Sequence, residues 1–144
     1  MNTRTELYKK LMANVLGLKN GLMHAAHAKG DTIHPGQKAM LFMIDKHSSA
    51  SVKLLADYLC ISSGAATQHL DPLVEAGLVV RATDHEDRRS VVISLTEAGK
   101  TKLREMMKAR LELVEKLFDD VSDEELEQFV ARIEKLQEKV KQLG

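Results

Sequence analysis

The chain has 144 residues, of which 44% are hydrophobic, so it is long and apolar enough for a domain with a core, which argues against disorder. Lysine and arginine equal aspartate and glutamate, 21 against 21, so the positive charge of many nucleic-acid-binding proteins is absent. Residues 48–100 carry five basic against seven acidic residues, so any DNA binding there must rest on local geometry.

The sequence has none of the signals of an exported or membrane protein. Its single cysteine, Cys60, excludes an internal disulfide and fits a reducing compartment. The first 21 residues alternate polar and apolar types at helical spacing, unlike a signal peptide, and no apolar stretch approaches the roughly 20 residues of a membrane span. We therefore expect a soluble, cytoplasmic protein, without a membrane partner or a cofactor.

Two amphipathic helices are predicted in the first third of the chain. The first covers about residues 4–28 and ends at Lys29-Gly30-Asp31. The second begins at Pro35, a residue suited to a first helical turn, and runs to about His47. Apolar side chains three and four positions apart define the face of the first helix: Leu7, Leu11, Val15, Leu18 and Leu22.

A short helix and a tight turn follow a loop at residues 48–51. Ser51 is a natural N-cap for a helix over Val52–Leu59. Cys60-Ile61 is the turn, at a place where helix-turn-helix motifs often use glycine to reach positive φ. Ala56 supplies the small side chain that two closely crossing helices need. We expect Cys60 to be buried and structural rather than a redox sensor.

A further helix is predicted after the N-cap Ser62, ending near Ala76 with Gly77 as the C′ residue. Its outer face is small and polar, which suits entry into a major groove and hydrogen bonding to base edges. An ordinary surface helix is the alternative, and the helix pair alone does not separate the two. The predicted DNA-contacting residues of this motif are Ser51, Ser62, Ser63, Gly64, Ala65, Thr67 and Gln68.

Several residues of this helix oppose tight DNA binding. It has no Lys or Arg between Ser62 and Ala76, and Asp71 would repel phosphates that it faced. Gly64 weakens the helix by up to about 1 kcal/mol relative to alanine. Pro72 lacks the amide that would bond to the carbonyl of Gln68, so we expect a kink or an early end of the helix there.

The next segment changes to the period of β-strands. Leu78–Arg81 and Val91–Leu95 are rich in β-branched residues and flank a polar stretch, which predicts a two-stranded hairpin. Arg88 and Arg89 at its tip would reach phosphates or the minor groove. A solvated charged turn would be the better interpretation of these arginines in isolation. After a helix-turn-helix, a DNA-binding wing is favoured.

Two long helices are predicted at the end of the chain. Thr96 caps a helix from about Glu97 to Phe118, and Ser122–Glu125 is a capping box that opens the last helix. That helix carries a heptad pattern, which could serve the subunit core, a dimer interface or a free coiled coil. It is too short to be stable alone, so a dimer interface shared with the first helix is favoured. The pattern consists of Leu126, Phe129, Ile133, Leu136, Val140 and Leu143.

Short strings of residues along positions 33–136 carry a family resemblance. They are Leu55-Ala56, Thr67, Gly77-Leu78-Val79 with Arg81, Asp87-x-Arg89, Leu95-Thr96-x-x-Gly99 and Ser122–Leu126. The chain resembles the MarR family of bacterial transcription regulators, although Ser63 stands where many members carry arginine.

This resemblance implies a triangular homodimer in which the first and the last two helices intertwine. It implies binding to a palindromic operator, usually as a repressor that a small aromatic or lipophilic effector releases. It also implies that Asp87 orients the wing by holding Arg89, which we expect to occur through a charge-assisted hydrogen bond.

The expected fold is mainly α with a small β-hairpin wing. A winged helix-turn-helix occupies residues 33–96 and dimerisation helices occupy 1–30 and 97–144, within a single domain spanning 1–144. The expected function is sequence-specific DNA binding. An enzyme is not expected, because the sequence has neither a glycine-rich phosphate loop nor a nucleophile elbow. The alternative is a winged-helix module that binds protein instead of DNA, which the neutral net charge favours.

Two groups of side chains suggest ligand sites. Flexible side chains near the junction of the dimerisation and DNA-binding regions could line an effector pocket, although core packing is favoured for any single methionine. These candidates are Met23, His27, Met40, Met43 and Met107. His24 and His27, with His34 and His47, could begin a metal site, but partly exposed histidines are favoured and no metal is expected.

Overall fold

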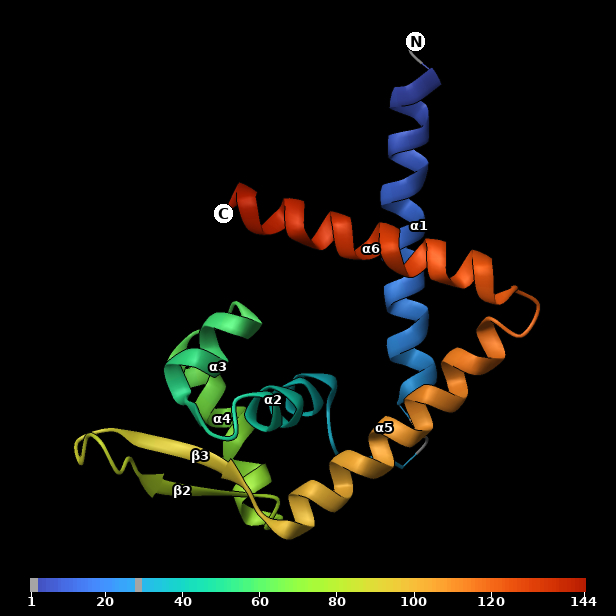
Figure 1. Ribbon diagram of the computed structural model, residues 1–144. Coiled ribbons are helices and arrows are strands. Elements are labelled where there is room, and N and C mark those ends of the chain that lie inside the picture. Colours follow the sequence, from blue (N-terminus) through green and yellow to red (C-terminus); the bar gives the residue numbers. More distant parts are fainter. Residues whose placement is uncertain (1–2, 28–29) are drawn as a thin grey trace. The chain divides into compact units, whose positions relative to one another are not determined.

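The computed structural model describes residues 3–27 and 30–144 and is mainly helical, as predicted (Figure 1). It divides into two compact units, Met1–Ala109 and Arg110–Gly144, with the boundary inside α5. Within the described residues, no helix combines the length and the apolar character that crossing a bilayer requires. The elements in chain order are α1 (Thr3–Ala26), α2 (Pro35–Lys46), β1 (Ala50–Ser51), α3 (Val52–Leu59), α4 (Ser63–Glu75), β2 (Val79–Thr83), β3 (Val91–Leu95), α5 (Glu97–Leu117) and α6 (Asp123–Leu143).

The predicted element boundaries agree with these bounds to within about two residues, with two exceptions. Position 28, the predicted end of the first helix, lies outside the described residues, as does Lys29 of the predicted break. The predicted loop at residues 48–51 contains the short strand β1.

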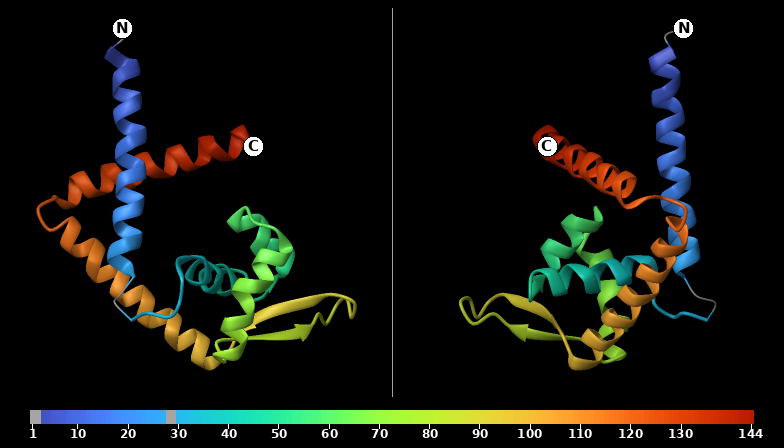
Figure 2. Two further views of the ribbon diagram at one scale, coloured as in Figure 1. Left: turned by 180° about the vertical axis from the view of Figure 1, so that it is seen from behind. Right: turned by 45° about the vertical axis from the view of Figure 1, so that its right-hand side comes forward.

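The core of the first unit lies between α2, α3, α4 and the sheet, where these helices gather at the base of the hairpin (Figure 2). Each large aliphatic side chain removed from water contributes about 1.5–3 kcal/mol, so this cluster supplies most of the stability of the winged helix. Its largest fully buried side chains are Met40, Leu41, Ile44, Leu55, Leu70, Leu73 and Ile93.

The sheet has three antiparallel strands in the order β1-β3-β2. In the hairpin Val79 pairs with Leu95 and Thr83 with Val91, and on the other side of β3 Ala50 pairs with Ile93. The sequence predicted the hairpin but not β1, because two residues are too few to show a strand period. The central strand therefore joins the helix-turn-helix to the wing.

The serines predicted as N-caps all cap their helices. The hydroxyl oxygens of Ser51, Ser62 and Ser122 accept hydrogen bonds from the amides three positions further on, at 3.1, 3.1 and 3.3 Å. Ser122 also forms the predicted capping box, since its amide donates to the Glu125 carboxylate at 3.2 Å. Each bond satisfies an amide that the helix itself leaves without an acceptor.

Thr96 joins the end of α4, the start of β2 and the start of α5. Its hydroxyl donates to the Gly77 carbonyl at 2.5 Å and accepts from the Gly99 amide at 3.0 Å, which confirms the predicted cap. Its own amide donates to the Leu78 carbonyl at 3.1 Å. A Cβ at Gly99 would lie 2.0 Å from that carbonyl oxygen, so only glycine fits. Gly77 has the positive φ, 70°, of the predicted C′ residue.

A half-buried ion pair fixes the connection between α1 and α2. Lys38 Nζ lies 2.6 Å from Asp31 Oδ2 and donates to the Ala26 carbonyl at 3.1 Å, and the two charged side chains are only 12% and 14% exposed. Burial raises the pKa of Asp31, but hydrogen bonds from Lys38 and the Ile33 amide outweigh it and hold that pKa below its usual value. This contribution to stability is present above the unfolded-state pKa and is lost as the pH falls through the lowered one.

The long helices carry apolar side chains that the chain leaves in solvent. No residue of Thr3–Ala26 is buried, and Leu11 is 56% exposed. In the second unit, Ile133 is 40% exposed and no residue of Asp123–Leu143 is buried. Phe118 contacts Phe129 within this unit, with ring centroids 5.8 Å apart.

Candidate nucleic-acid interface

The turn between α3 and α4 has the backbone geometry of a tight helix-turn-helix. Cys60 lies in the left-handed region at φ 54°, the conformation for which glycine is usually chosen. Ala56 is buried, as the predicted close crossing of the two helices requires. The prediction that Cys60 is buried is wrong, because its side chain is exposed. Cys60 is therefore distinguished by its left-handed backbone and not by burial of its side chain in the core.

The outer face of α4 presents small and polar groups to solvent. Ser62, Ser63, Gly64 and Gln68 are exposed, whereas Ala65 and Thr67 are half-buried. The opposite face, with Ala66, Leu70 and Leu73, packs into the core as predicted. The Thr67 hydroxyl donates to the carbonyl of Ser63 at 3.0 Å, within the same helix. The first two turns of α4 are therefore narrow and free of charge.

Pro72 does not end α4 early, so of the two predicted outcomes, a kink or an early end, the second is wrong. The helix continues to Glu75, and the amide of Ala76 donates to the Pro72 carbonyl at 2.9 Å. Pro72 is on the solvent side, while Leu70 and Leu73 on either side of it are buried. The lost amide therefore affects only an outward carbonyl, and packing of the inner face keeps the helix intact.

Asp71 on α4 forms an ion pair with Arg81 on β2. Arg81 Nη2 lies 2.6 Å from Asp71 Oδ1, with both side chains partly exposed. The sequence indicated Asp71 as a source of repulsion toward phosphates and did not reveal this partner. The pair neutralises much of the negative charge of Asp71 and connects α4 directly to the wing.

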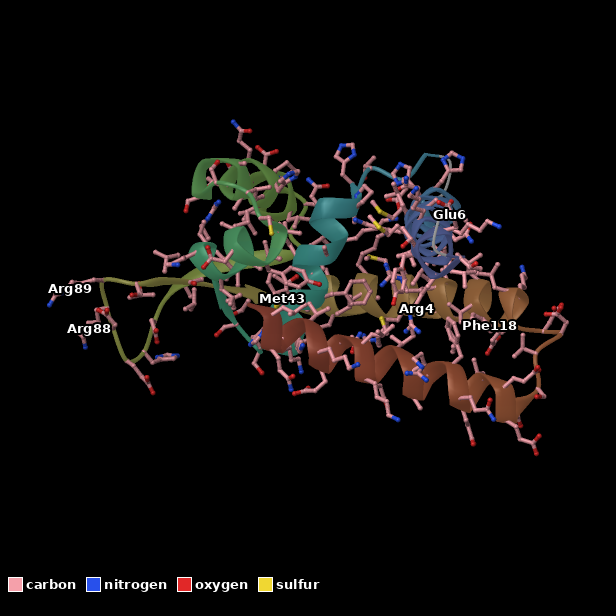
Figure 3. The ribbon with its side chains drawn as sticks, turned by 90° about the horizontal axis from the view of Figure 1, so that it is seen from above. Arg4, Glu6, Met43, Arg88, Arg89 and Phe118 are labelled. Carbon is pink, nitrogen blue, oxygen red and sulfur yellow. The ribbon has the colours of Figure 1, made fainter. Side chains whose placement is uncertain are left out.

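Arg88 and Arg89 lie at the tip of the hairpin, with their side chains directed away from the sheet (Figure 3). Both are exposed, and no carboxylate of residues 3–27 or 30–144 lies within ion-pair distance of them. Asp87 Oδ1 accepts from the backbone amide of Arg89 at 3.0 Å, and Oδ2 accepts from the Ser90 hydroxyl at 3.2 Å. Asp87 thus holds the backbone of the turn, and not the guanidinium group that we expected it to hold.

The candidate effector residues lie in two different environments. Met40 and Met43 are buried in the core, whereas Met23, His27 and Met107 are exposed. The prediction of core packing is therefore confirmed for Met40 and Met43 and wrong for Met23 and Met107. Among the described residues, no three histidine, cysteine or carboxylate side chains are grouped as a metal ion would require.

Comparison with known proteins gives one family. The model of the MarR family matches residues 33–91. The uncharacterised helix-turn-helix transcriptional regulator YwhA of Bacillus subtilis is 32% identical over 97 residues, covering 67% of this chain and 70% of its own. The transcriptional repressor MdtR of the same organism is 28% identical over 94 residues, covering 65% and 61%.

Solved structures of other proteins superpose on nearly the whole length of this chain. A MarR family protein from Bacillus stearothermophilus matches with a TM-score of 0.82 and 26% identity, covering 98% of this chain and 99% of that one. The transcriptional regulator BldR from Sulfolobus solfataricus has the same fold, with a TM-score of 0.77 at 23% identity and coverage of 96% and 99%.

The capped helix α4, whose first two turns are free of charge, followed by an arginine-tipped hairpin, defines a winged helix-turn-helix DNA-binding transcription regulator. The chain belongs to the MarR family. None of the relatives named above favours the alternative of a protein-binding module.

Proposed function

We propose that this protein is a cytoplasmic homodimer that binds a palindromic operator through two winged helices and represses transcription. The observation that carries the proposal is the exposed, narrow and uncharged N-terminal half of α4, because such a surface fits a major groove without needing a charged partner there. Repression is supported by the name of the relative MdtR, a transcriptional repressor.

The two helix N-termini of the motif supply phosphate contacts in this proposal. Ser51 and Ser62 cap α3 and α4, and the free amides of each first turn point toward an anion placed beyond the cap. Ser63, Gly64 and Ala65 allow close approach of the backbone, and Thr67 and Gln68 then face base edges. Phosphates fix the register, and the bases give the sequence preference.

The wing supplies most of the electrostatic attraction. Arg88 and Arg89 are exposed at the hairpin tip, and α4 offers no Lys or Arg of its own. Asp87 orients the wing by holding the backbone of the turn, so that both guanidinium groups project toward phosphates or the minor groove. A negative charge close to DNA is consistent with this positioning role.

A dimer would cover the apolar side chains of the long helices. The exposed residues of α1 and α6 form stripes at helical spacing, larger than a monomeric soluble protein normally leaves in water. A two-fold axis through such an interface would present two copies of α4, which matches a palindromic operator. The region 33–96 then contacts DNA, while segments 1–30 and 97–144 form the dimer.

A small aromatic or lipophilic effector would release the DNA. Met23, His27 and Met107 are the exposed candidates for its site, and Met40 and Met43 lie in the core. Polarisable and flexible methionine side chains suit such ligands.

The test is a titration of the protein against its own promoter fragment and against an unrelated duplex, at two salt concentrations. Arg89→Ala should weaken binding to both duplexes and lower the slope of log K against log salt by about one unit. Arg132→Ala, an equal charge change at an exposed site on α6, is the control and should change little. Equal affinity of the wild type for every genomic fragment would contradict the proposal.

Asp87→Ala tests the wing mechanism by the sign of its effect. Removing a negative charge near DNA should strengthen binding if only net charge matters. We expect weaker binding, because the bonds to the Arg89 amide and the Ser90 hydroxyl are lost and the turn that carries the arginines is freed. Tighter binding at both salt concentrations would show that Asp87 does not orient the wing.

A further inference from the structure

We infer that α4 selects adenine–thymine pairs over guanine–cytosine pairs at the position in each operator half-site that Gln68 contacts. The inference rests on the proposed function, since it assigns a base preference to the same interface. The inference depends on which donors and acceptors on the outer face of α4 are not already used in hydrogen bonds within the protein.

Guanine presents only acceptors, N7 and O6, to the major groove, so a helix that reads guanine needs donors, which are usually Arg or Lys. From the N-cap Ser62 to the C-cap Ala76, α4 contains neither. Asp71, about one turn beyond Gln68 on α4, has only acceptor oxygens, and one of them is paired with Arg81 Nη2 at 2.6 Å, so Asp71 provides no donor for guanine.

Thr67 uses its hydroxyl within the helix and His69 packs toward α2, so the donors left on the outer face are the Ser62 and Ser63 hydroxyls and the Gln68 amide. The Thr67 hydroxyl gives its hydrogen to the Ser63 carbonyl at 3.0 Å. The His69 imidazole is half-buried and lies against the first turn of α2, with its ring atoms 3.5–3.8 Å from a Cβ built on Gly36. Neither side chain is therefore available to donate to a base.

Gln68 has the group that adenine requires. Its side chain is exposed, and within the described part of the chain its amide makes no hydrogen bond. A carboxamide can accept from adenine N6 and donate to adenine N7 at the same time, which is the usual pairing of glutamine with this base.

The neighbouring side chains suit thymine. Because its hydroxyl is bonded inward to the helix, Thr67 offers its methyl group to the groove, and Ala65, three residues before Gln68, offers another. Thymine is the only base with a methyl group at C5, and apolar contact with it is a recurrent mode of recognition. Gln68 with Thr67 and Ala65 therefore forms a surface complementary to A·T pairs.

The first experiment is selection of duplexes by the full-length protein from a library with randomised half-sites, repeated with Gln68→Ala. The position at which this variant loses its preference identifies the pair that Gln68 contacts, and we expect A·T there. Gln128→Ala, an exposed glutamine on α6, is the matched control and should leave the selected sequence unchanged. If no sequence is enriched, the proposed function fails. If guanine is enriched at the Gln68 position, only the present inference fails.

The second experiment removes single atoms from the DNA. Replacing the contacted adenine by 7-deazaadenine should weaken wild-type binding by roughly 5- to 150-fold and leave Gln68→Ala unaffected. Replacing the adjacent thymines by uracil should weaken the wild type more than Thr67→Ser, which keeps the hydroxyl and the methyl group of Ala65 but lacks the methyl group of Thr67. Gln68→Arg should move the preference to guanine. Equal sensitivity of wild type and variants to the base analogues would overturn the assignment.

Discussion

The winged helix and the long helices use similar apolar patterns with opposite results. In α2, α3, α4 and β3 the apolar positions are occupied by fully buried side chains such as Leu41, Leu70 and Ile93. In α1 and α6 the same spacing of three and four residues gives side chains such as Leu11 and Ile133 that stay exposed. The first region buries its apolar side chains within the chain, whereas the second leaves them in solvent, where the proposed dimer would cover them.

This difference shows what helical periodicity can and cannot predict. The period identifies an apolar face, but not the surface that covers it. The same argument applied to the heptad pattern of α6 left subunit core, dimer interface and coiled coil open. The structure argues against the subunit core, because no residue of Asp123–Leu143 is buried within the chain.

The largest effect should come from charges placed on the exposed stripe of α6. Leu126→Asp combined with Ile133→Asp would bury two unpaired carboxylates in a dimer interface, each costing several kcal/mol. We expect monomers or unfolded protein, measured by light scattering and circular dichroism. Gln128→Asp with Lys135→Asp adds carboxylates to exposed polar positions of the same helix and should remain dimeric. A stable dimer in the first double variant would refute the interface assignment.

The second largest effect should come from a substitution in the core of the winged helix. Ile93→Ala removes a fully buried side chain from the central strand and should lower the free energy of unfolding by about 2–5 kcal/mol. Val91→Ala on the same strand, where the side chain is 49% exposed, should cost far less. Urea denaturation measures both. Similar losses for the two variants would mean that the hairpin core is not where the structure places it.

A smaller loss is expected at the start of α5. Gly99→Ala puts a methyl group against the Leu78 carbonyl, so the backbone must shift, at a cost of about 1–3 kcal/mol. Gly17→Ala in α1, where nothing lies within 4 Å of the added Cβ, is the control and should be neutral or stabilising by up to about 1 kcal/mol. Thermal unfolding of the two variants gives the comparison, and a neutral Gly99→Ala would contradict the close packing at this junction.

The smallest expected effect is a gain in stability from a substitution at Cys60. Cys60→Gly removes the strain of a left-handed residue at φ 54°, worth about 1 kcal/mol, part of which is offset by the greater freedom of glycine in the unfolded chain. Cys60→Ala keeps the strain and should give no gain. The difference in melting temperature between these two variants measures the effect of backbone strain at position 60. Equal melting temperatures would show that the left-handed backbone there is not strained.

Local signals in the sequence predicted much of this fold. The caps at Ser51, Ser62 and Ser122 depend on atoms three residues apart, so the sequence contains both partners. The turn at Gly77 and the hairpin are equally local. These features placed most element boundaries within two residues of those observed.

Contacts between distant residues were the part that the sequence did not reveal. Asp71 and Arg81 meet only because the turn after α4 reverses the chain, and Lys38 reaches the Ala26 carbonyl only because α1 ends beside α2. The chemistry of Pro72 predicted a kink or an early end of the helix, whereas packing of Leu70 and Leu73 lets the helix continue to Glu75. Tertiary packing supplied the missing information in each case.

The central position of β3 determines when the winged helix can fold during synthesis. β1 and β2 pair with β3 and not with each other, so both are without a partner until Val91–Leu95 has left the ribosome. The Gly77 carbonyl after α4 also lacks its hydrogen bond from the Thr96 hydroxyl until Thr96 follows. All of α1, with its apolar surface, is therefore exposed in the cell before the core can close, and this interval is when the nascent chain most needs protection from aggregation.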